Sequence, residues 1–280
     1  MHFRSGDGTS FGQFSNLFSK RLCYIAAMFE GKSIAVVIPA YNEALLIKQT
    51  LLSIPEFVDY ICVVDDASSD QTVLEIEQIS TPKIRLIQHK SNAGVGAAII
   101  SGYRECLRLD VDVVAVMGAD AQMDPADLQR VVTPVVQNRA DYCKGDRLSW
   151  KGVQKVMPIA RFLANHVLSV FTRLTSGYGD VRDSQCGYTA ISKEVLGRLQ
   201  LSRIYPRYGF PNDILAHLFT IRARLAQVTV RPLYGAETSG ITFGTAMFKV
   251  PLVLLRSLIY RLRNKPPRLP SVSSTTAERA

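Results

Sequence analysis

Residues 34–66, IAVVIPAYNEALLIKQTLLSIPEFVDYICVVDD, contain the pattern that decides the fold. Residues 34–38 form a β-branched apolar run that stops at Pro39, and residues 60–64 form a second run that ends in two aspartates. The stretch between them reads as a helix that Asn42 can cap and that ends near residue 53. The segment therefore predicts a strand, a helix and a second strand, the order of a parallel β-α-β unit.

The same alternation continues along the chain. Further strands are expected at residues 84–87, 113–117 and 226–230, and further helices at about 70–79, 95–109, from 125, 156–174 and 212–220. Repeated units of this kind predict an α/β fold, Rossmann-like, with a mostly parallel sheet and helices on both faces. No linker-like composition interrupts residues 33–240, so we expect a single domain there.

The formal net charge of +9 is unevenly distributed over the 280 residues. Residues 33–240 carry 22 basic and 21 acidic side chains, whereas residues 241–270 carry six basic and no acidic ones. A nucleic-acid-binding protein would carry a basic stripe across its folded body, and the near-neutral body opposes that. We therefore expect no nucleic-acid partner, and a non-catalytic basic binding module is the least favoured interpretation.

The C-terminal charge coincides with an apolar stretch. Residues 241–263 combine apolar and basic positions, which is typical of an amphipathic helix on a membrane surface. The alternative is a terminal helix packed on the core with solvated charges. The N-terminal arm, residues 1–32, contains a second candidate helix of this type, and residues 264–280, rich in Pro, Ser and Thr, are expected to be disordered.

Targeting signals are not evident in the sequence. We find no secretion signal and no uninterrupted apolar stretch of roughly 18 to 20 residues. The five cysteines are widely spaced and include no C-x-x-C pair, which fits a reducing cytosol. The expected location is cytoplasmic, in peripheral association with the inner face of a membrane.

Acidic residues follow three of the predicted strands. Glu43, Asp66 and Asp120 each come shortly after a strand, and ligands bind at the carboxyl ends of the strands in such sheets. Oxygen ligands spaced as Asp120-x-Gln122-x-Asp124 can hold Mg²⁺ or Mn²⁺. Taken alone, this spacing is more often a helix cap in a solvated turn. Its position opposite other acidic strand ends favours the functional interpretation.

Four ordered motifs carry a resemblance to a known family: PAYNE (39–43), VDDASSDQT (64–72), NAGVG (92–96) and DAQMDP (120–125). The chain resembles family 2 glycosyltransferases with the GT-A fold over roughly residues 33–240. It is most similar to the polyprenyl-phosphate glycosyltransferases, the group that contains dolichyl-phosphate mannose synthases. The subgroup likeness comes from DAQMDP together with KGDR (144–147), DSQCGY (183–188) and YGFPND (208–213).

The resemblance implies a role for each matching residue on the donor side. Pro39, Tyr41 and Glu43 would line the nucleotide pocket, and Asp66 would accept hydrogen bonds from the base. Asp120 and Gln122 would hold the metal on the diphosphate. The family usually has Asp-x-Asp in this turn, and here the first Asp is replaced by Gly118, which leaves one fewer anionic ligand.

The resemblance also implies basic groups for the phosphates and carboxylates for the acceptor. Arg147 and Arg161 match positions where the family places basic groups near phosphates, although Arg161 is equally well interpreted as helix-surface charge. Arg231 lies near a family arginine, with a one-residue insertion after it. Asp183 and Asp213 are the candidate acceptor-side carboxylates, with a helix cap as the alternative for Asp213.

Two acceptors remain open on these grounds. The first hypothesis is an inverting, metal-dependent transfer of a hexose from a GDP- or UDP-linked nucleotide sugar to a polyprenyl phosphate at the cytoplasmic membrane face. The second is transfer to a sugar hydroxyl in polysaccharide or glycan assembly. With a phosphate acceptor, Asp213 would orient the substrate; with a hydroxyl acceptor, it would be the general base.

Overall fold

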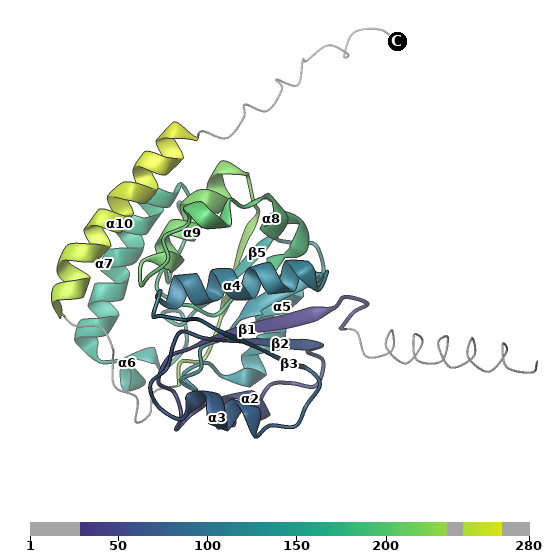
Figure 1. The fold of residues 1–280 in the computed structure, drawn as a ribbon. Coiled ribbons are helices and arrows are strands. Elements are labelled where there is room, and N and C mark those ends of the chain that lie inside the picture. Colours follow the sequence, from purple (N-terminus) through teal and green to yellow (C-terminus); the bar gives the residue numbers. More distant parts are fainter. Residues whose placement is uncertain (1–28, 234–242, 265–280) are drawn as a thin grey trace, which may run out of the picture.

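The computed structural model describes residues 29–233 and 243–264, and its centre is a seven-stranded sheet (Figure 1). The strand order across the sheet is β3-β2-β1-β4-β6-β5-β7. The strands are β1 (Ile34–Ala40), β2 (Tyr60–Asp65), β3 (Ile84–Gln88), β4 (Val113–Val116), β5 (Tyr142–Asp146), β6 (Thr189–Ser192) and β7 (Leu225–Thr229).

The sheet is mostly parallel, as the sequence predicted. Strands β1 to β4 pair in parallel, and so do β5 and β7, whereas β6 runs antiparallel to both of its neighbours, β4 and β5. Register within the parallel part places Ala40 beside Asp65, so that β1 and β2 end together. The short strands β5 and β6 were not predicted, because four or five residues carry too little pattern to distinguish a strand from a loop.

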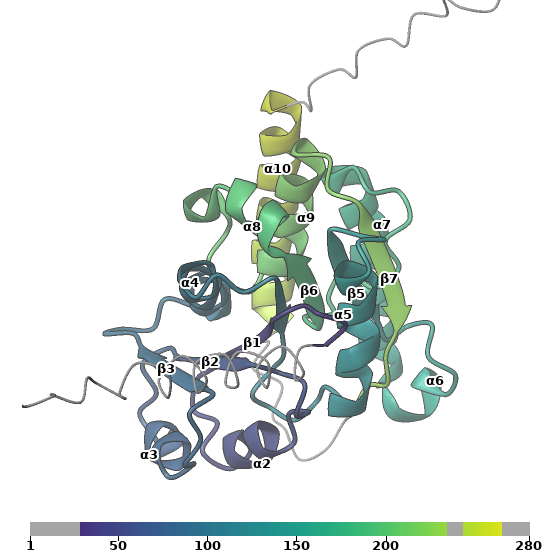
Figure 2. The same ribbon diagram turned by 90° about the vertical axis from the view of Figure 1, so that its right-hand side faces the viewer.

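Helices cover both faces of the sheet. Figure 2 shows α4 above the β1–β3 part of the sheet and α2 and α3 below it. The helices are α2 (Ile47–Leu52), α3 (Thr72–Glu77), α4 (Val95–Arg108), α5 (Leu128–Val136), α6 (Val153–Val156), α7 (Ile159–Ser176), α8 (Lys193–Arg198), α9 (Phe210–Thr220) and α10 (Phe243–Arg263), with 3-10 turns η1 (Pro125–Asp127) and η2 (Leu201–Arg203).

Two hydrophobic cores lie on the two faces of the sheet. Alternate side chains of β1 separate them, since Val36 and Ile38 pack with α2, α3 and α5, whereas Ala35 and Val37 pack with α4, α8 and α9. This is the period of two that a buried strand imposes on its side chains. Both faces of β1 are apolar because both are covered by helices.

The first helix is shorter than the sequence predicted. Helix α2 begins at Ile47, and Asn42 has a φ of 57° instead of capping the helix. The side-chain oxygen of Asn42 accepts a hydrogen bond from the Ser69 amide at 2.8 Å. Asn42 therefore joins the loops that follow β1 and β2, where the alternative hydrogen bonds of an asparagine compete with a helix start.

The predicted C-terminal segment, residues 241–263, is helical from Phe243 to Arg263, and α10 runs through Pro251. It packs beside α9 and α7. The predicted N-terminal arm lies outside the described residues up to residue 28, as does the predicted tail from residue 265. Within the described ranges, no helix is long and apolar enough to cross a membrane.

Candidate functional site

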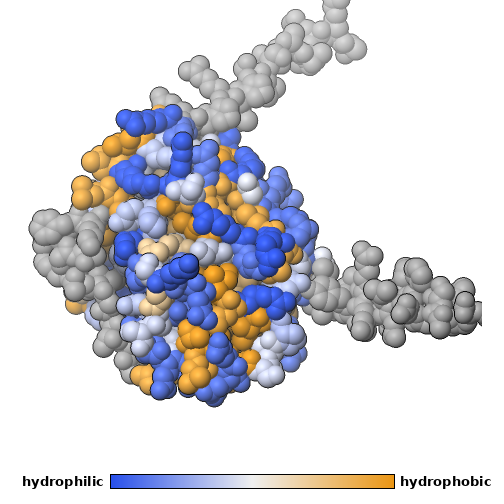
Figure 3. All heavy atoms as spheres, viewed as in Figure 1, coloured by the Kyte–Doolittle hydropathy of each residue, from blue (hydrophilic) through white to orange (hydrophobic). Residues whose placement is uncertain are grey.

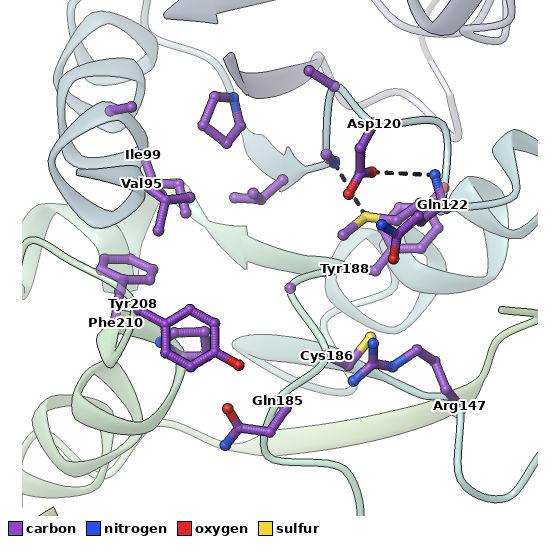
Figure 4. A pocket seen from close by; sticks show the side chains of 18 of the residues that line it. Val95, Ile99, Asp120, Gln122, Arg147, Gln185, Cys186, Tyr188, Tyr208 and Phe210 are labelled. Carbon is purple, nitrogen blue, oxygen red and sulfur yellow. Dashed lines mark hydrogen bonds between the residues drawn. The ribbon is translucent and has the colours of Figure 1, made fainter. Parts of the chain in front are cut away.

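A cleft of about 730 Å³ opens at the carboxyl ends of β1, β2 and β4. Figure 4 shows Asp120 and Gln122 on one side of this cavity and Arg147, Gln185 and Tyr208 around the other. Most of the side chains that the sequence singled out line it: Pro39, Tyr41, Glu43, Asp66, Asp120, Gln122, Arg147, Arg161 and Arg231. The structure thus brings together residues from six separate stretches of the chain.

The turn at residues 118–124 carries the predicted metal ligands. The Asp120 carboxylate accepts a hydrogen bond from the Gln122 amide at 3.2 Å, and Ala121 between them has a φ of 54°. The turn is tethered from both sides, because Thr50 Oγ1 donates to the Ala119 carbonyl and the Leu233 amide donates to the Gln122 carbonyl. The tethers hold Asp120 at the edge of the cleft.

Gly118 leaves room for the Asp120 carboxylate. A Cβ at position 118 would lie 2.8 Å from Asp120 Oδ1, so any other residue would displace that oxygen. The Gly118 amide is directed at Met123 Sδ, 3.2 Å away. Where the family usually has two aspartates, this turn has the Asp120 carboxylate packed beside the backbone of Gly118.

Negative charge accumulates beside this turn. Burial, together with the nearby carboxylates of Asp120 and Asp70, raises the pKa of Glu43 to about 7. Desolvation and like charges both disfavour the ionised form of a carboxyl group. A cation or a proton in this part of the cleft would relieve the repulsion.

The side chains in this turn supply some of the ligands that a divalent cation needs. Among the described residues, no group of three or more His, Cys, Asp or Glu side chains is arranged to hold a metal ion. Asp120 and the Gln122 amide oxygen are nevertheless hard ligands, and Mg²⁺ commonly takes one or two carboxylates and completes its shell with water and substrate phosphates. The residues present therefore fit an ion that a diphosphate helps to hold.

Asp66 holds a loop that lines the cleft, through Asn92 and Gly94. Its carboxylate accepts hydrogen bonds from the backbone amides of Ala93 at 2.9 Å and Gly94 at 2.7 Å, and His89 Nδ1 lies 2.7 Å from Asp66 Oδ1. A carboxylate offers about four acceptor positions, so Asp66 retains capacity for a base. The role of the NAG segment in binding Asp66 was not anticipated from the sequence.

Arg147 is held from behind by Asp183. Arg147 Nε donates to Asp183 Oδ2 at 2.8 Å and Nη2 donates to Oδ1 at 3.1 Å, a bidentate pair. Asp183 is fully buried and also accepts from the backbone amides of Gln185 and Cys186. Burial acts to raise the pKa of Asp183, but the charge and hydrogen bonds of Arg147 outweigh it and lower that pKa.

Asp213 lies at the junction of α9 and α10, outside the cleft lining. It is fully buried and accepts hydrogen bonds from the Tyr205 amide at 2.8 Å and from Ser257 Oγ at 2.7 Å, and it pairs with Arg256. Burial acts to raise its pKa, but His217, Ser257 and Arg256 lower it on balance.

The acceptor-side roles that the sequence predicted for Asp183 and Asp213 remain predictions. Neither lines the cleft, since each carboxylate is buried against a basic partner and backbone amides. Motif position alone could not show which way these side chains point. Their geometry is that of positioning residues, one for Arg147 and one for α10.

A buried lysine was missed from the sequence. Lys144 is fully buried in β5, and its ammonium group donates to the Cys186 carbonyl in the loop beneath the cleft. Burial lowers the pKa of Lys144. Cys186 lines the cleft, but burial raises the pKa of its thiol, which is typical of an inert cysteine.

Comparison with known proteins identifies relatives. Residues 35–199 match the profile of glycosyl transferase family 2. The UDP-N-acetylglucosamine–dolichyl-phosphate N-acetylglucosaminyltransferase of Methanococcus voltae is 31% identical over 218 residues, covering 72% of this chain and 86% of that protein. The polyprenol monophosphomannose synthase of Mycolicibacterium smegmatis is 29% identical over 240 residues, covering 81% of this chain and 89% of that protein.

Solved structures share the architecture. Glucosyl-3-phosphoglycerate synthase from Mycobacterium tuberculosis, crystallised with Mn²⁺, UDP and glucosyl-3-phosphoglycerate, superimposes with a TM-score of 0.63 at 22% identity. The match covers 91% of this chain and 86% of that one. At this identity the likeness concerns the fold, and it confirms the predicted GT-A architecture.

Proposed function

The chain belongs to glycosyl transferase family 2, and we propose that it transfers a hexose from a nucleotide sugar to a polyprenyl phosphate at the cytoplasmic face of a membrane. It is a glycosyltransferase, and relatives named for dolichyl-phosphate and polyprenol acceptors support the choice of acceptor. GDP and UDP donors both fit the proposal, because an Asp66 carboxylate can accept from either base.

One observation favours a phosphate acceptor over a sugar hydroxyl. In the part of the chain that the structure describes, the carboxylates lining the cleft are Glu43, Asp66 and Asp120, and all three follow β1, β2 or β4 on the nucleotide side. Arg147, which follows β5, and Arg161 of α7 line the cleft from other elements. A sugar hydroxyl needs a general base to remove its proton, whereas a phosphate monoester is already an anion at neutral pH. Elements that contribute arginines but no carboxylate to the cleft lining suit the phosphate.

The proposed reaction is a single in-line displacement. A phosphate oxygen of the acceptor attacks the anomeric carbon, and the bond from that carbon to the nucleoside diphosphate breaks, which inverts the configuration. Arg147 and Arg161 draw the acceptor phosphate into the cleft and offset its charge. Asp183 keeps the Arg147 fork in one orientation, which lowers the entropic cost of binding.

On the donor side, Pro39, Tyr41 and Glu43 would flank the nucleotide, and Arg231 would contact its phosphates. Asp120 and Gln122 would hold Mg²⁺ or Mn²⁺ against the diphosphate. The bound ion would supply charge neutralisation for the departing diphosphate.

The test is a transfer assay with labelled nucleotide sugars, a polyprenyl phosphate and a panel of oligosaccharide acceptors. We expect an organic-soluble product that mild acid hydrolyses, because a glycosyl phosphate ester is acid-labile. Arg147→Met and Arg161→Met should each raise the KM for the lipid phosphate more than that for the nucleotide sugar. Label recovered only in a water-soluble saccharide would replace the proposal with the sugar-hydroxyl alternative.

A further inference from the structure

The carboxylate of Asp66 is nearly saturated with hydrogen bonds from the protein itself. Oδ1 accepts from the Ala93 amide at 2.9 Å and lies 2.7 Å from His89 Nδ1, and Oδ2 accepts from the Gly94 amide at 2.7 Å. A carboxylate only accepts hydrogen bonds, so His89 Nδ1 carries the proton in this contact. Each carboxylate oxygen has two acceptor positions. Within the described residues, both positions of Oδ1 are therefore occupied, and one position of Oδ2 is left.

The orientation of this carboxylate is fixed from several sides. The Asp66 amide donates to the Ala40 carbonyl at 2.8 Å, and the His89 amide donates to the Asp65 carbonyl at 2.9 Å. The His89 ring is held in turn, because its Nε2 lies 2.9 Å from Ser101 Oγ in α4. The ends of β1 and β2, the residue after β3 and α4 thus hold Asp66 together. A ligand therefore meets the acceptor position that the protein leaves open.

The open acceptor position is reached from the cleft. Figure 3 shows an outer surface of interspersed hydrophilic and hydrophobic side chains on the side that carries α4. Asp66 contributes almost nothing to the outer surface, since it is 2% exposed, and it lines the cleft beside Asn92 and Gly94. A hydrogen-bond donor of a ligand that is buried against Asp66 without an acceptor therefore loses the water that it had in solution.

The two bases that the proposed function leaves open differ in the number of hydrogen bonds that they donate. Uracil presents one ring N–H, at N3, between two carbonyl oxygens. Guanine presents two adjacent donors, N1–H and the 2-amino group, which match the two oxygens of a free carboxylate. A carboxylate whose Oδ1 is occupied satisfies the single donor of uracil but leaves one donor of guanine without a partner.

We propose that Asp66, with its Oδ1 occupied by His89 and Ala93, selects uracil over guanine, so that the donor substrate is a UDP-linked sugar. The selection follows from the one acceptor position at Oδ2 and does not require exclusion of a purine ring by size. This inference rests on the proposed function for the placement of a base at Asp66, and it adds the identity of that base.

The test measures the binding of free nucleotides to the full chain by titration calorimetry, with Mg²⁺ and without acceptor. Two pairs of ligands isolate single hydrogen bonds. UDP is compared with 3-methyl-UDP, which lacks the ring N–H, and GDP is compared with IDP, which lacks only the 2-amino group. UDP should bind at least about tenfold more tightly than GDP and than 3-methyl-UDP. IDP should bind at least about threefold more tightly than GDP, because the donor without a partner is gone.

The comparison of GDP with IDP distinguishes the number of hydrogen bonds from the size of the ring. Equal affinities for these two nucleotides would overturn the proposal, since ring size alone would then disfavour purines. GDP that binds as tightly as UDP would overturn it as well. Both outcomes are read from the wild-type protein, so they do not depend on whether any variant folds.

A pair of variants locates the contact. In Asp66→Ala, methylation of UDP at N3 should change the affinity less than about threefold, because the acceptor of the N–H is gone. Asp70→Ala is the matched control, since Asp70 follows the same strand but does not line the cleft, and it should keep the full effect of methylation. Inorganic diphosphate should bind both variants within about twofold of wild type, which reports an intact phosphate site. Undiminished sensitivity to methylation in Asp66→Ala would contradict the proposal.

Transfer assays separate this inference from the proposed function. Faster transfer to polyprenyl phosphate from GDP-linked sugars than from UDP-linked sugars would refute the choice of base while supporting the proposed acceptor. The expected pattern of nucleotide affinities, together with no transfer to any polyprenyl phosphate, would refute the proposed acceptor while supporting the selection of uracil.

Discussion

At the scale of single residues, the site depends on a small number of carboxylates whose environments differ. Asp120 stands at the cleft edge in a tethered turn, and Glu43 is kept partly protonated by burial and by its neighbours. Asp183 and Asp213 are ionised and buried against arginines. Burial and bonding partners, more than position in the sequence, therefore determine the protonation state of each carboxylate.

Asp120 is expected to dominate turnover. Asp120→Asn should lower kcat by about 100-fold or more, because the developing charge on the diphosphate loses its electrostatic support, and it should remove the activation by Mg²⁺ or Mn²⁺. Asp124→Asn is the matched control in the same turn, since Asp124 caps the Ala126 amide outside the cleft lining. A metal-activated Asp120→Asn enzyme in steady-state assays would contradict the assignment.

The ionised form of Glu43 is expected to lower the stability of the folded protein. Its pKa in the folded protein, about 7, exceeds the ordinary value of 4.5, so the folded state binds this proton more tightly than the unfolded state does. The contribution of protonated Glu43 to stability is complete below pH 4.5 and is lost as the pH rises through 7.

Glu43→Gln should therefore raise the free energy of unfolding by about 1 kcal/mol at pH 8, less than the full pKa shift implies because the side chain is partly exposed. The gain should fall toward zero at pH 4.5. Urea unfolding at the two pH values measures this, and a gain of equal size at both would show that charge is not its cause.

At the scale of elements, the close approach of α4 to β1 sets the back wall of the cleft. A Cβ at Gly102 would lie 2.3 Å from Val37 Cγ1, so the helix and the strand touch directly. Gly94 and Val95, at the start of the same helix, line the cleft. Displacement of α4 therefore changes both stability and the site.

Gly102→Ala is expected to lower the free energy of unfolding by about 1 to 3 kcal/mol through overpacking. The control is Gly197→Ala in α8, where an added Cβ meets nothing within 4 Å, so stability should be unchanged or raised by up to about 1 kcal/mol. Thermal unfolding of the two variants provides the comparison, and equal effects would refute the packing argument.

The elements also show what local pattern can predict. The strands and helices of the β1–α5 half were predicted within a few residues, apart from the late start of α2. Strands β5 and β6 were missed, and the reversal of β6 follows from its pairing between β4 and β5. Pairing direction is a non-local property, and the four residues of β6 do not specify it.

At the scale of the whole molecule, Asp213 joins three parts of the chain. It holds α10 through Arg256 and Ser257, and it holds the Tyr205 backbone in the connection that leads to Tyr208 at the cleft. Helix α10 and the cleft wall therefore share one buried carboxylate. Because the pKa of Asp213 lies below its ordinary 3.8, this contribution is present at neutral pH and is lost as the pH falls through that lowered value.

Asp213→Asn should lower the free energy of unfolding at pH 7 by about 3 kcal/mol, as expected when one partner of a buried pair is removed. It should retain kcat within about tenfold and keep the acid limb of the pH–rate profile. A general base would instead lose about 100- to 10,000-fold in rate together with that limb. Denaturant unfolding and pH–rate profiles of this variant decide between the two roles.

The repeated strand–helix order and the family could be inferred from the sequence alone, because strand periodicity and motifs at strand ends are local properties. The tertiary structure was needed to show that Asp183 and Asp213 are buried against arginines, that Gly118 makes room for Asp120, and that α7 turns its apolar stripe outward. Each of these depends on which distant segment a side chain meets, and burial and pairing arise from the packed chain as a whole.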